Sequence, residues 1–249
     1  MKIGMFDSGI GGITVLKEAL LRLPNVDYIY YSDNIHAPYG TKDKNVVKDY
    51  VQNVVEFLIK QGATVIVIAC NTATSIAASS LREQYDIPII GMEPAVKLAL
   101  LNKKQGRILV TATPLTLQEE KYQNLVHHFD INNRVDSLPL PRLVDFAENF
   151  IFDERVTQYL EETLSSYDLT KYKGIVLGCT HFVYFKDLFR KIVPPHVELY
   201  DGNTGTIKHL CSLIGDKLNK DNSAKGQVTL YYSEKEDKNH TILNKYLSI

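Results

Sequence analysis

The sequence contains few cysteines, little net charge and no tryptophan. Its three cysteines, Cys70, Cys179 and Cys211, are an odd number and too few for a disulfide framework, so we expect free thiols in a reducing compartment. The formal net charge is −1, and the lysines and arginines are scattered along the chain. Such a chain lacks the basic surface that binds nucleic acid or an anionic membrane, so we expect small molecules as its partners.

Long apolar runs are also missing. No stretch approaches the roughly 20 apolar residues of a transmembrane helix, and no basic and apolar signal segment precedes the first strand-like run. We therefore expect a cytoplasmic protein without a membrane partner. The 249 residues are 45% apolar and 23% charged, as is ordinary for a chain that buries a full core. This length fits one large domain or two compact domains.

Short runs of strand-forming residues alternate with helical patterns. They predict strands at residues 2–6, 28–32, 64–69, 87–90, 107–111, 174–178, 197–200 and 228–232. The clearest helix spans residues 43–61, where valine and leucine recur with helical spacing until Gly62. Continuously apolar strands, such as 65–68, are typical of parallel sheets covered by helices on both faces. The sequence therefore predicts an α/β protein with doubly wound, mainly parallel sheets.

Two passages along the chain predict the domain boundaries. The polar segment 102–106 precedes a new strand, and another passage from strand to helix follows Tyr200. We predict a first α/β domain of residues 1–97 together with 206–249, and a second α/β domain of residues 98–205.

Two predicted strands end in similar segments, Ala69-Cys70-Asn71-Thr72 and Gly178-Cys179-Thr180-His181. Each segment reads as strand, cysteine, polar donors and then helix. In open α/β sheets the ligand crevice lies beyond the carboxyl ends of the strands, so we expect both cysteines at such crevices. Two domains that face each other would bring the thiols together.

The position of each cysteine suggests how reactive it is. A thiol at a strand-to-helix junction lies near backbone N–H groups that favour the thiolate. A free cysteine can instead be a small buried apolar residue, which is our interpretation of Cys211 in the predicted helix 206–218. The polar neighbours of Cys70 and Cys179 would be difficult to satisfy in a core, so we favour chemistry there. His181 is either a proton-relay partner of Cys179 or a structural histidine.

The segment after the first strand, Phe6-Asp7-Ser8-Gly9-Ile10-Gly11-Gly12, fits a nucleotide-binding loop poorly. The Gly-x-Gly-x-x-Gly pattern needs glycine where Thr14 stands, and the Gly-Lys-Ser/Thr ending of a phosphate loop is absent. Asp7 is placed either to orient a cationic group or tune a thiol, or to cap the following helix. These two roles are equally compatible with its position.

Other polar positions have simpler explanations. Asp33 and the segment Ala37-Pro38-Tyr39-Gly40 follow the second strand, where turn formation is sufficient to explain them. Glu93-Pro94 is typical of a helix start. The cysteines are far apart, and His127-His128 diverge on a helix, so we expect no bound metal.

Five segments in order resemble the bacterial glutamate racemases. They are Phe6-Asp7-Ser8-Gly9-Ile10-Gly11-Gly12, Pro38-Tyr39-Gly40, Ala69-Cys70-Asn71-Thr72-Ala73-Thr74, Gly91-Met92-Glu93-Pro94-Ala95 and Leu177-Gly178-Cys179-Thr180-His181-Phe182. The resemblance continues to the turn Tyr200-Asp201-Gly202. It implies two α/β domains with pseudo-twofold symmetry, a buried site between them, no cofactor and a homodimer. It also implies a supply of D-glutamate for peptidoglycan synthesis.

The same resemblance implies roles for individual residues. Cys70 and Cys179 would be the acid/base pair, with Asp7 and Asp33 supporting Cys70, and with His181 and Glu148 supporting Cys179. The residues that would bind substrate are Asp7, Ser8, Tyr39, Gly40, Asn71, Thr72, Thr180 and His181.

The chain departs from the family pattern in two places. Ser32 stands where the family usually has glycine, and Leu138-Pro139-Leu140-Pro141 replaces a cysteine-proline pair. Related aspartate and hydantoin racemases typically have glutamate where His181 stands, which favours glutamate as substrate. A racemase of a related amino acid such as aspartate remains an alternative. A cysteine hydrolase would need only one thiol, and an amino-acid-binding module would need neither.

Overall fold

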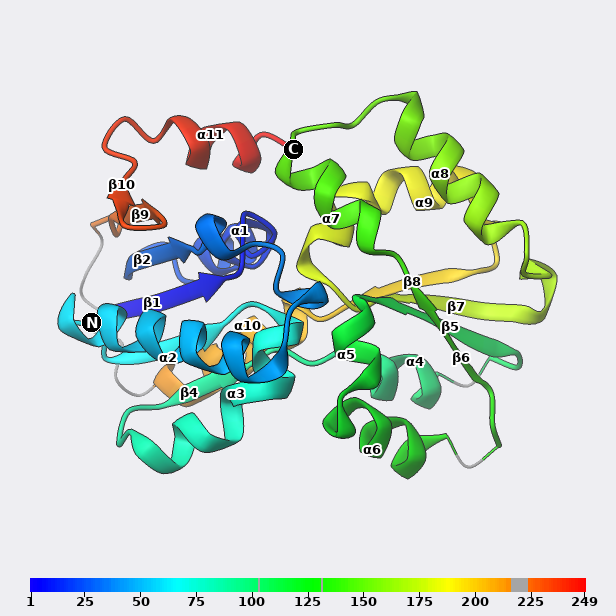
Figure 1. Ribbon diagram of the computed structural model, residues 1–249, viewed down its shortest axis with the longest axis horizontal. Helices are drawn as coiled ribbons and strands as arrows, with labels where there is room; N and C mark the ends of the chain where they lie inside the picture. The colour runs from blue at the N-terminus through cyan, green and yellow to red at the C-terminus, as the bar shows by residue number, and fades with distance from the viewer. Residues whose placement is uncertain (103, 131, 216–223) are drawn as a thin grey trace.

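The computed structural model, which describes residues 1–102, 104–130, 132–215 and 224–249, contains two sheets side by side (Figure 1). The first sheet consists of β1 (Lys2–Asp7), β2 (Asp27–Ser32), β3 (Val65–Ile68), β4 (Ile89–Gly91), β9 (Val228–Tyr232) and β10 (Lys235–Glu236). The second consists of β5 (Arg107–Ala112), β6 (Val135–Pro139), β7 (Tyr172–Leu177) and β8 (Glu198–Asp201). Every strand pairing is parallel except that of β10 with β9. The prediction of an α/β fold with mainly parallel sheets is confirmed.

The two sheets share a pattern of connections. The first has the order β10-β9-β2-β1-β3-β4, and the second has the order β6-β5-β7-β8. In the first, β1 lies between β2 and β3, just as β5 lies between β6 and β7 in the second. Strands β3 and β7 therefore occupy equivalent places. Cys70 and Cys179 each stand two residues beyond the end of one of these strands.

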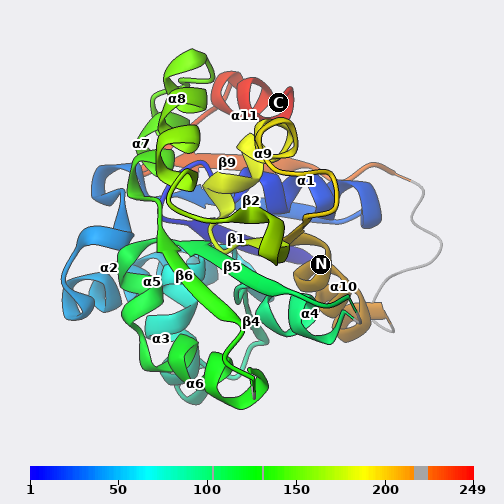
Figure 2. The same ribbon diagram turned by 90° about the vertical axis from the view of Figure 1, so that its right-hand side faces the viewer.

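Helices cover both faces of each sheet (Figures 1 and 2). Around the first sheet these are α2 (Lys44–Lys60) and α3 (Asn71–Gln84) on one face, and α1 (Ile13–Arg22), α10 (Asn203–Ile214) and α11 (Thr241–Leu247) on the other. Around the second they are α4 (Val96–Leu101), α5 (Pro114–Gln118) and α6 (Glu120–Phe129), and opposite them α7 (Pro141–Glu148), α8 (Glu154–Leu164) and α9 (Lys186–Ile192). Parallel strands enclosed in this way are buried on both faces, which explains their continuously apolar sequences.

Helix α2 shows how the local sequence fixes an element. The Asp43 carboxylate accepts hydrogen bonds from the backbone N–H groups of Asn45 and Val46, so it caps the helix. The buried side chains lie on one stripe: Val47, Val51, Val54, Val55 and Leu58. Gly62 follows the helix with a φ of 87°, a conformation that glycine adopts readily. The helix predicted at residues 43–61 is confirmed, with the terminal residue at each end serving as a cap.

One apolar core continues across both sheets. It includes Met5 and Leu16 of the first sheet and its helices, together with Leu143 and Phe189 on the helices of the second. Because burial of apolar surface is the main stabilising term in folding, this shared core holds the two halves at a fixed separation. Separate clusters lie under α2 and α3 and under α4 and α6.

Two strands lie where the sequence analysis predicted none. Strand β6 contains Asp136, Ser137 and Pro139 and lies at a sheet edge, where polar residues and proline are tolerated. Strand β10 has only two residues. The helix predicted at 206–218 begins earlier, at Asn203, and its predicted end lies outside the described residues.

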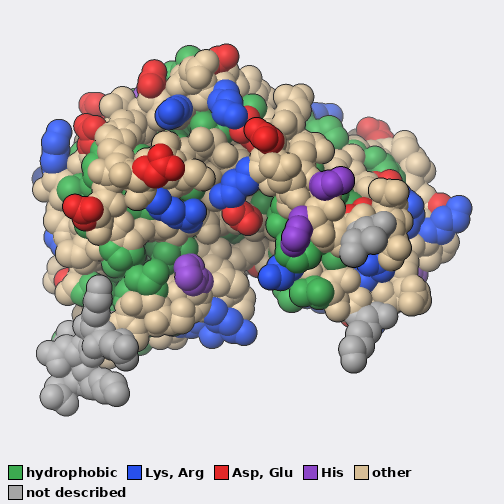
Figure 3. Space-filling view, turned by 90° about the horizontal axis from the view of Figure 1, so that it is seen from below, with side chains coloured by type: hydrophobic (Ala, Val, Ile, Leu, Met, Phe, Trp, Pro, Cys, Tyr) green, Lys and Arg blue, Asp and Glu red, His purple; other side chains and the backbone are tan. Residues whose placement is uncertain are grey.

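The molecular surface is hollowed between the two halves, and acidic and basic side chains are interspersed on the face seen in Figure 3. Within the described ranges, no helix has the length and apolar character needed to cross a membrane.

Candidate active site

Cys70 lies at the start of α3, where its side chain serves as the helix cap. Its Sγ accepts a hydrogen bond of 3.4 Å from the Ala73 N–H and donates to Ser8 Oγ at 3.8 Å. Burial raises the pKa of the Cys70 thiol, the Asp7 carboxylate raises it further, and the Ala73 N–H partly offsets these effects. These surroundings favour the protonated thiol.

Asp7 ends β1 and connects the two sheets. Its Oδ1 accepts hydrogen bonds from the N–H and the hydroxyl of Ser8, at 2.7 and 3.3 Å, and its Oδ2 accepts one from Thr180 Oγ1 at 2.8 Å. Burial raises the pKa of Asp7, although the charge of His181 and the Thr180 hydrogen bond oppose that rise. The interpretation of Asp7 as a helix cap is wrong, because Gly12 occupies the cap position of α1.

Cys179 stands before the 3₁₀ segment η4 (Thr180–Phe185) and faces the ring of His181. The Cys179 Sγ lies 3.6 Å from His181 Nδ1, and His181 Nε2 lies 2.6 Å from Glu148 Oε1. Burial alone would lower the pKa of His181, yet its hydrogen bonds to Cys179 and Glu148 hold that pKa well above its usual value. A protonated His181 ring would place a positive charge beside the Cys179 sulfur.

Glu148, the last residue of α7, is held by groups in the loops that follow β1 and β2 of the first sheet. Its Oε1 accepts a hydrogen bond of 2.9 Å from the Ile10 N–H, and its Oε2 accepts one of 3.4 Å from Asn34 Nδ2. Glycine is required for this approach, since a Cβ on Gly9 would lie 1.7 Å from Glu148 Oε1. A Cβ on Gly11 would lie 2.4 Å from the His181 ring nitrogen.

Hydrogen bonds link the surroundings of the two cysteines. Cys70, Ser8, Asp7 and Thr180 form a chain of contacts that crosses between the sheets. Thr180 directly follows Cys179 in the sequence. Burial raises the pKa of Cys70 most, Asp7 raises it next, and Cys179 is near enough that a negative charge on its sulfur would raise it further. The structure therefore places both thiols in one buried site, reached from equivalent strands of two sheets.

The sequence matches a known family of enzymes over most of its length. The family model for Asp/Glu/hydantoin racemases matches residues 15–210. This chain belongs to that racemase family. A glutamate racemase from Halothermothrix orenii is 53% identical over 253 residues, covering 100% of this chain and 98% of the relative. The resemblance found in the sequence is thereby confirmed.

Solved structures of glutamate racemases have the same fold as this chain. A glutamate racemase isoform from Bacillus anthracis superimposes with a TM-score of 0.86 at 29% identity, covering 99% of this chain and 94% of that one. A glutamate racemase from Francisella tularensis, solved in complex with D-glutamate, has a TM-score of 0.83 at 31% identity, covering 100% and 94%. The racemase fold therefore extends over essentially the whole chain.

A cluster of three hydroxyls lies beside the candidate site of this racemase. Thr72 Oγ1 is 2.9 Å from Thr113 Oγ1 and 3.0 Å from Thr116 Oγ1, and the latter two are 2.9 Å apart. The sequence analysis selected Thr72 but missed Thr113 and Thr116. Thr113 follows β5, the equivalent of β1, so its place in the repeated pattern is the signal that could have revealed it.

Asn71 presents an unused acceptor. Its Nδ2 donates to the Met92 carbonyl at 3.3 Å, whereas its buried Oδ1 has no hydrogen-bond partner among the described residues. A buried polar atom without a partner is costly and rare in proteins. Asn71 Oδ1 is therefore a candidate acceptor for a ligand ammonium group.

Asp33 contacts Tyr39 rather than a thiol directly. The Tyr39 hydroxyl donates to Asp33 Oδ2 at 2.5 Å, and His36 Nδ1 lies 2.9 Å from Asp33 Oδ1. Burial raises the pKa of Tyr39 strongly, and Asp33 raises it further, so the phenol stays protonated. Support of Cys70 by Asp33 remains a prediction.

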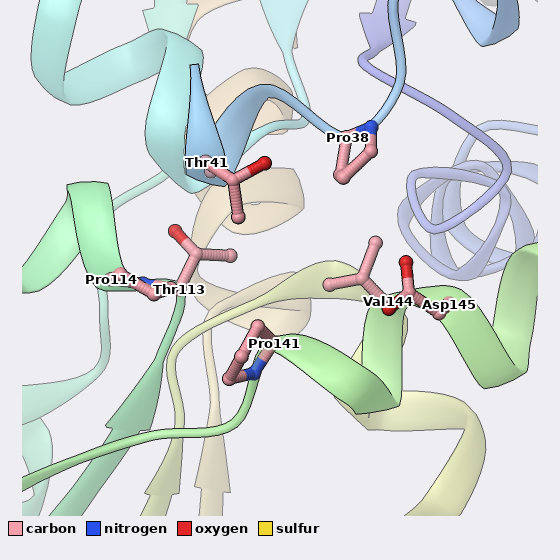
Figure 4. Close-up of a pocket in the computed structure, with 8 residues that line it drawn as sticks. Pro38, Thr41, Thr113, Pro114, Pro141, Val144 and Asp145 are labelled. Carbon is pink, nitrogen blue, oxygen red and sulfur yellow. The ribbon is translucent and has the colours of Figure 1, made fainter. Parts of the chain in front are cut away.

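A cavity of about 280 Å³ opens between the two halves (Figure 4). Loops and helices of both halves contribute its lining residues, which are Pro38, Gly40, Thr41, Thr113, Pro114, Pro141, Val144 and Asp145. A Cβ on Gly40 would lie 2.5 Å from the Thr113 Cβ, so the cavity adjoins the hydroxyl cluster. Across the described part of the chain, no group of three or more His, Cys, Asp and Glu side chains could hold a metal ion.

Proposed function

We propose that this chain interconverts L-glutamate and D-glutamate, using Cys70 and Cys179 as its acid and base and no cofactor. The D-glutamate would supply peptidoglycan synthesis. The observation that carries this proposal is the placement of the two thiols, which follow equivalent strands of two sheets and enter one buried network. Inversion at Cα requires removal of a proton from one face and delivery of a proton to the other, which two opposed groups can perform.

One turnover exchanges the states of the two sulfur atoms. The Cys179 thiolate, beside protonated His181, removes the Cα proton and forms a new S–H bond. The Cys70 thiol delivers its own proton to the opposite face of the carbanion, so that its S–H bond breaks as the new C–H bond forms. In the reverse direction Cys70 is the base and Cys179 is the acid.

Preorganised donors lower the barrier to forming the carbanion. The Cα–H bond is a very weak acid, so stabilisation of developing charge in a site without water must provide most of the rate acceleration. We assign the Asn71 Oδ1 to the substrate ammonium group and the hydroxyls of Thr72, Thr113 and Thr116 to a substrate carboxylate. The remaining proposed contacts to substrate come from Asp7, Ser8, Tyr39, Gly40, Thr180 and His181.

We also propose a route for the substrate and a setting for the enzyme. The cavity that Gly40 and Thr113 line is the proposed entrance, because it opens between the halves beside the hydroxyl cluster. A homodimer is proposed from the family resemblance. Catalysis by a free thiol and thiolate requires a reducing compartment, which supports the cytoplasm.

A chiral assay of the purified protein tests the function. L-glutamate should yield D-glutamate, and the reverse, after dialysis against chelator and without pyridoxal phosphate, nucleotide or metal. Aspartate should react roughly 10- to 200-fold more slowly, because its distal carboxylate is one methylene short of the donors. Equal rates on both amino acids would indicate a broader racemase, and activity that returns only with an additive would contradict the cofactor-free mechanism.

A further inference from the structure

The end of α7 is held by a tyrosine from the last helix of the chain. Helix C-terminal carbonyls lack partners within their own helix and need donors from elsewhere. The Tyr246 hydroxyl, on α11, lies 3.1 Å from the Ala147 carbonyl oxygen and 3.2 Å from that of Glu148, to which it donates. Tyr246 therefore fixes the main chain of Glu148, whose carboxylate holds His181.

A second tyrosine fixes the other side of that carboxylate. The Tyr184 hydroxyl, from η4, donates to the Ile10 carbonyl at 2.9 Å. The N–H of Ile10 is the group that donates to Glu148 Oε1, also at 2.9 Å. The Tyr246 hydroxyl thus holds α7, which carries Glu148. The Tyr184 hydroxyl holds the loop whose Ile10 N–H orients the Glu148 side chain.

Aromatic contacts keep these two hydroxyls in place. The rings of Tyr184 and Tyr246 are 5.7 Å apart, and the Phe150 ring is 5.4 Å from Tyr246. The Lys245 ammonium lies 3.9 Å from the centre of the Phe150 ring, in cation–π geometry. Helix α11 is therefore anchored on the segment that follows α7.

We propose that Tyr246 and Tyr184 are positioning residues for Cys179, acting through Glu148 and His181. This inference rests on the function proposed above. The charged or titratable groups that face His181 are Cys179, Glu148 and Asp7. Of these, Glu148 is the one that the two tyrosines hold. Loss of either hydroxyl would let the carboxylate move from His181 Nε2, and the imidazolium beside Cys179 would then be less favoured.

Removal of single hydroxyls tests this proposal. In Tyr246→Phe and in Tyr184→Phe, kcat should fall roughly tenfold, because small misplacements of catalytic groups are costly. KM should change little. The ¹⁵N NMR titration of the His181 imidazole should move to lower pH, which a purely structural role would not cause.

Tyr28→Phe is the matched control. The Tyr28 hydroxyl, on β2, is buried and also donates to two backbone carbonyls, those of Ala19 at 3.3 Å and Leu23 at 3.0 Å. These carbonyls lie at the C-terminal end of α1, the end that points away from the Ile10 loop. This variant should lose similar stability on thermal unfolding while keeping kcat and the His181 titration. An equal loss of kcat in Tyr28→Phe would overturn the proposal.

A double-mutant cycle then separates positioning from general structure. If Tyr246 acts through Glu148, the double variant Tyr246→Phe/Glu148→Gln should have nearly the same kcat as Glu148→Gln alone. Independent losses that multiply would overturn the proposal. Failure of the wild-type protein to racemise glutamate would instead refute the proposed function. The His181 titration would still decide the positioning role, because an unmoved titration in both tyrosine variants contradicts it.

Discussion

The two cysteines occupy equivalent positions in the fold but different chemical environments. Cys70 caps the 14-residue helix α3 and lies beside the Asp7 carboxylate, whereas Cys179 precedes a short 3₁₀ segment and faces His181. Burial and then the charge of Asp7 raise the pKa of Cys70, while a protonated ring accompanies Cys179. The proposed reaction uses one thiol and one thiolate, and the two environments differ in the charged group that lies beside each sulfur.

Each cysteine environment also depends on a contact from the opposite half. Asp7, beside Cys70, is held by Thr180 of η4 in the second half, and Glu148, behind His181, is held by Ile10 in the loop after β1 of the first half. Movement of one half relative to the other would therefore disturb both thiols together. The following variants test how far the two environments differ and how strongly they are coupled.

The largest effect should come from removing either thiol. Cys70→Ala and Cys179→Ala should each reduce racemisation by more than about 10³-fold, since each removes the proposed acid or base. The double variant should be hardly worse than either single variant, because the two residues act as one unit. Rates of interconversion followed by chiral chromatography give the comparison. Cys211→Ala is the control and should stay active; near wild-type racemisation by Cys179→Ala would contradict the mechanism.

A smaller effect should follow from Glu148→Gln, which mainly alters the environment of Cys179 through His181. We expect kcat to fall about 10²-fold, as is typical when the support of a catalytic group is lost. His181 keeps its proton below its raised pKa and loses it as the pH rises through that value. Removal of the Glu148 charge should lower this pKa, so the alkaline limb of kcat/KM should move to lower pH. An unmoved limb would show that Glu148 does not act through His181.

Gly11→Ala should disturb the contact between the halves. The new Cβ would lie 2.4 Å from the His181 ring and 2.6 Å from Thr180 Oγ1, so both must shift. We expect a loss of about 1–3 kcal/mol in the free energy of unfolding, with a fall in kcat. Gly205→Ala, within α10, meets no atom within 4 Å and should instead retain activity and gain up to about 1 kcal/mol. Urea unfolding measures both, and equal stability of the two variants would contradict this account.

The smallest effect should come from breaking a surface ion pair that joins the two halves. Lys44 Nζ lies 2.7 Å from Glu119 Oε2, but the lysine side chain is 54% exposed. Lys44→Gln should therefore cost less than about 1 kcal/mol in the free energy of unfolding and leave racemisation unchanged. A larger loss in urea unfolding would mean that this surface pair, rather than the buried network, holds the halves together.

Much of the fold could be predicted from the sequence because parallel strands such as β3 leave continuous apolar runs. The two cysteines could also be recognised as candidate site residues from the sequence, since both follow such a run and precede polar donors. Strand β6 was missed because Asp136 and Pro139 at a sheet edge do not resemble a buried strand. One of the two roles considered for Asp7, capping the next helix, was wrong because the chain continues to Gly12 before α1 begins.

Other parts of the candidate site could not be predicted from local sequence. Thr113 reads as an ordinary helix cap, which it is, and its contact with Thr72 depends on how the two sheets face each other. The contact of Tyr246 with the end of α7 joins segments about 100 residues apart along the chain. Neither contact leaves a periodic pattern in the sequence.

Racemisation in heavy water tests the central claim most directly, namely that two opposed thiols exchange a proton at Cα. Starting from L-glutamate, the D-glutamate formed should carry solvent deuterium at Cα. The remaining L-glutamate should gain little deuterium at early times, because the base that removed its Cα proton returns that same proton when the carbanion reverts, whereas the acid on the opposite face holds a solvent deuteron. Mass spectrometry of the separated enantiomers gives both values. Product that retains the original Cα proton would contradict the account, because it would require a single base that carries the proton from one face to the other.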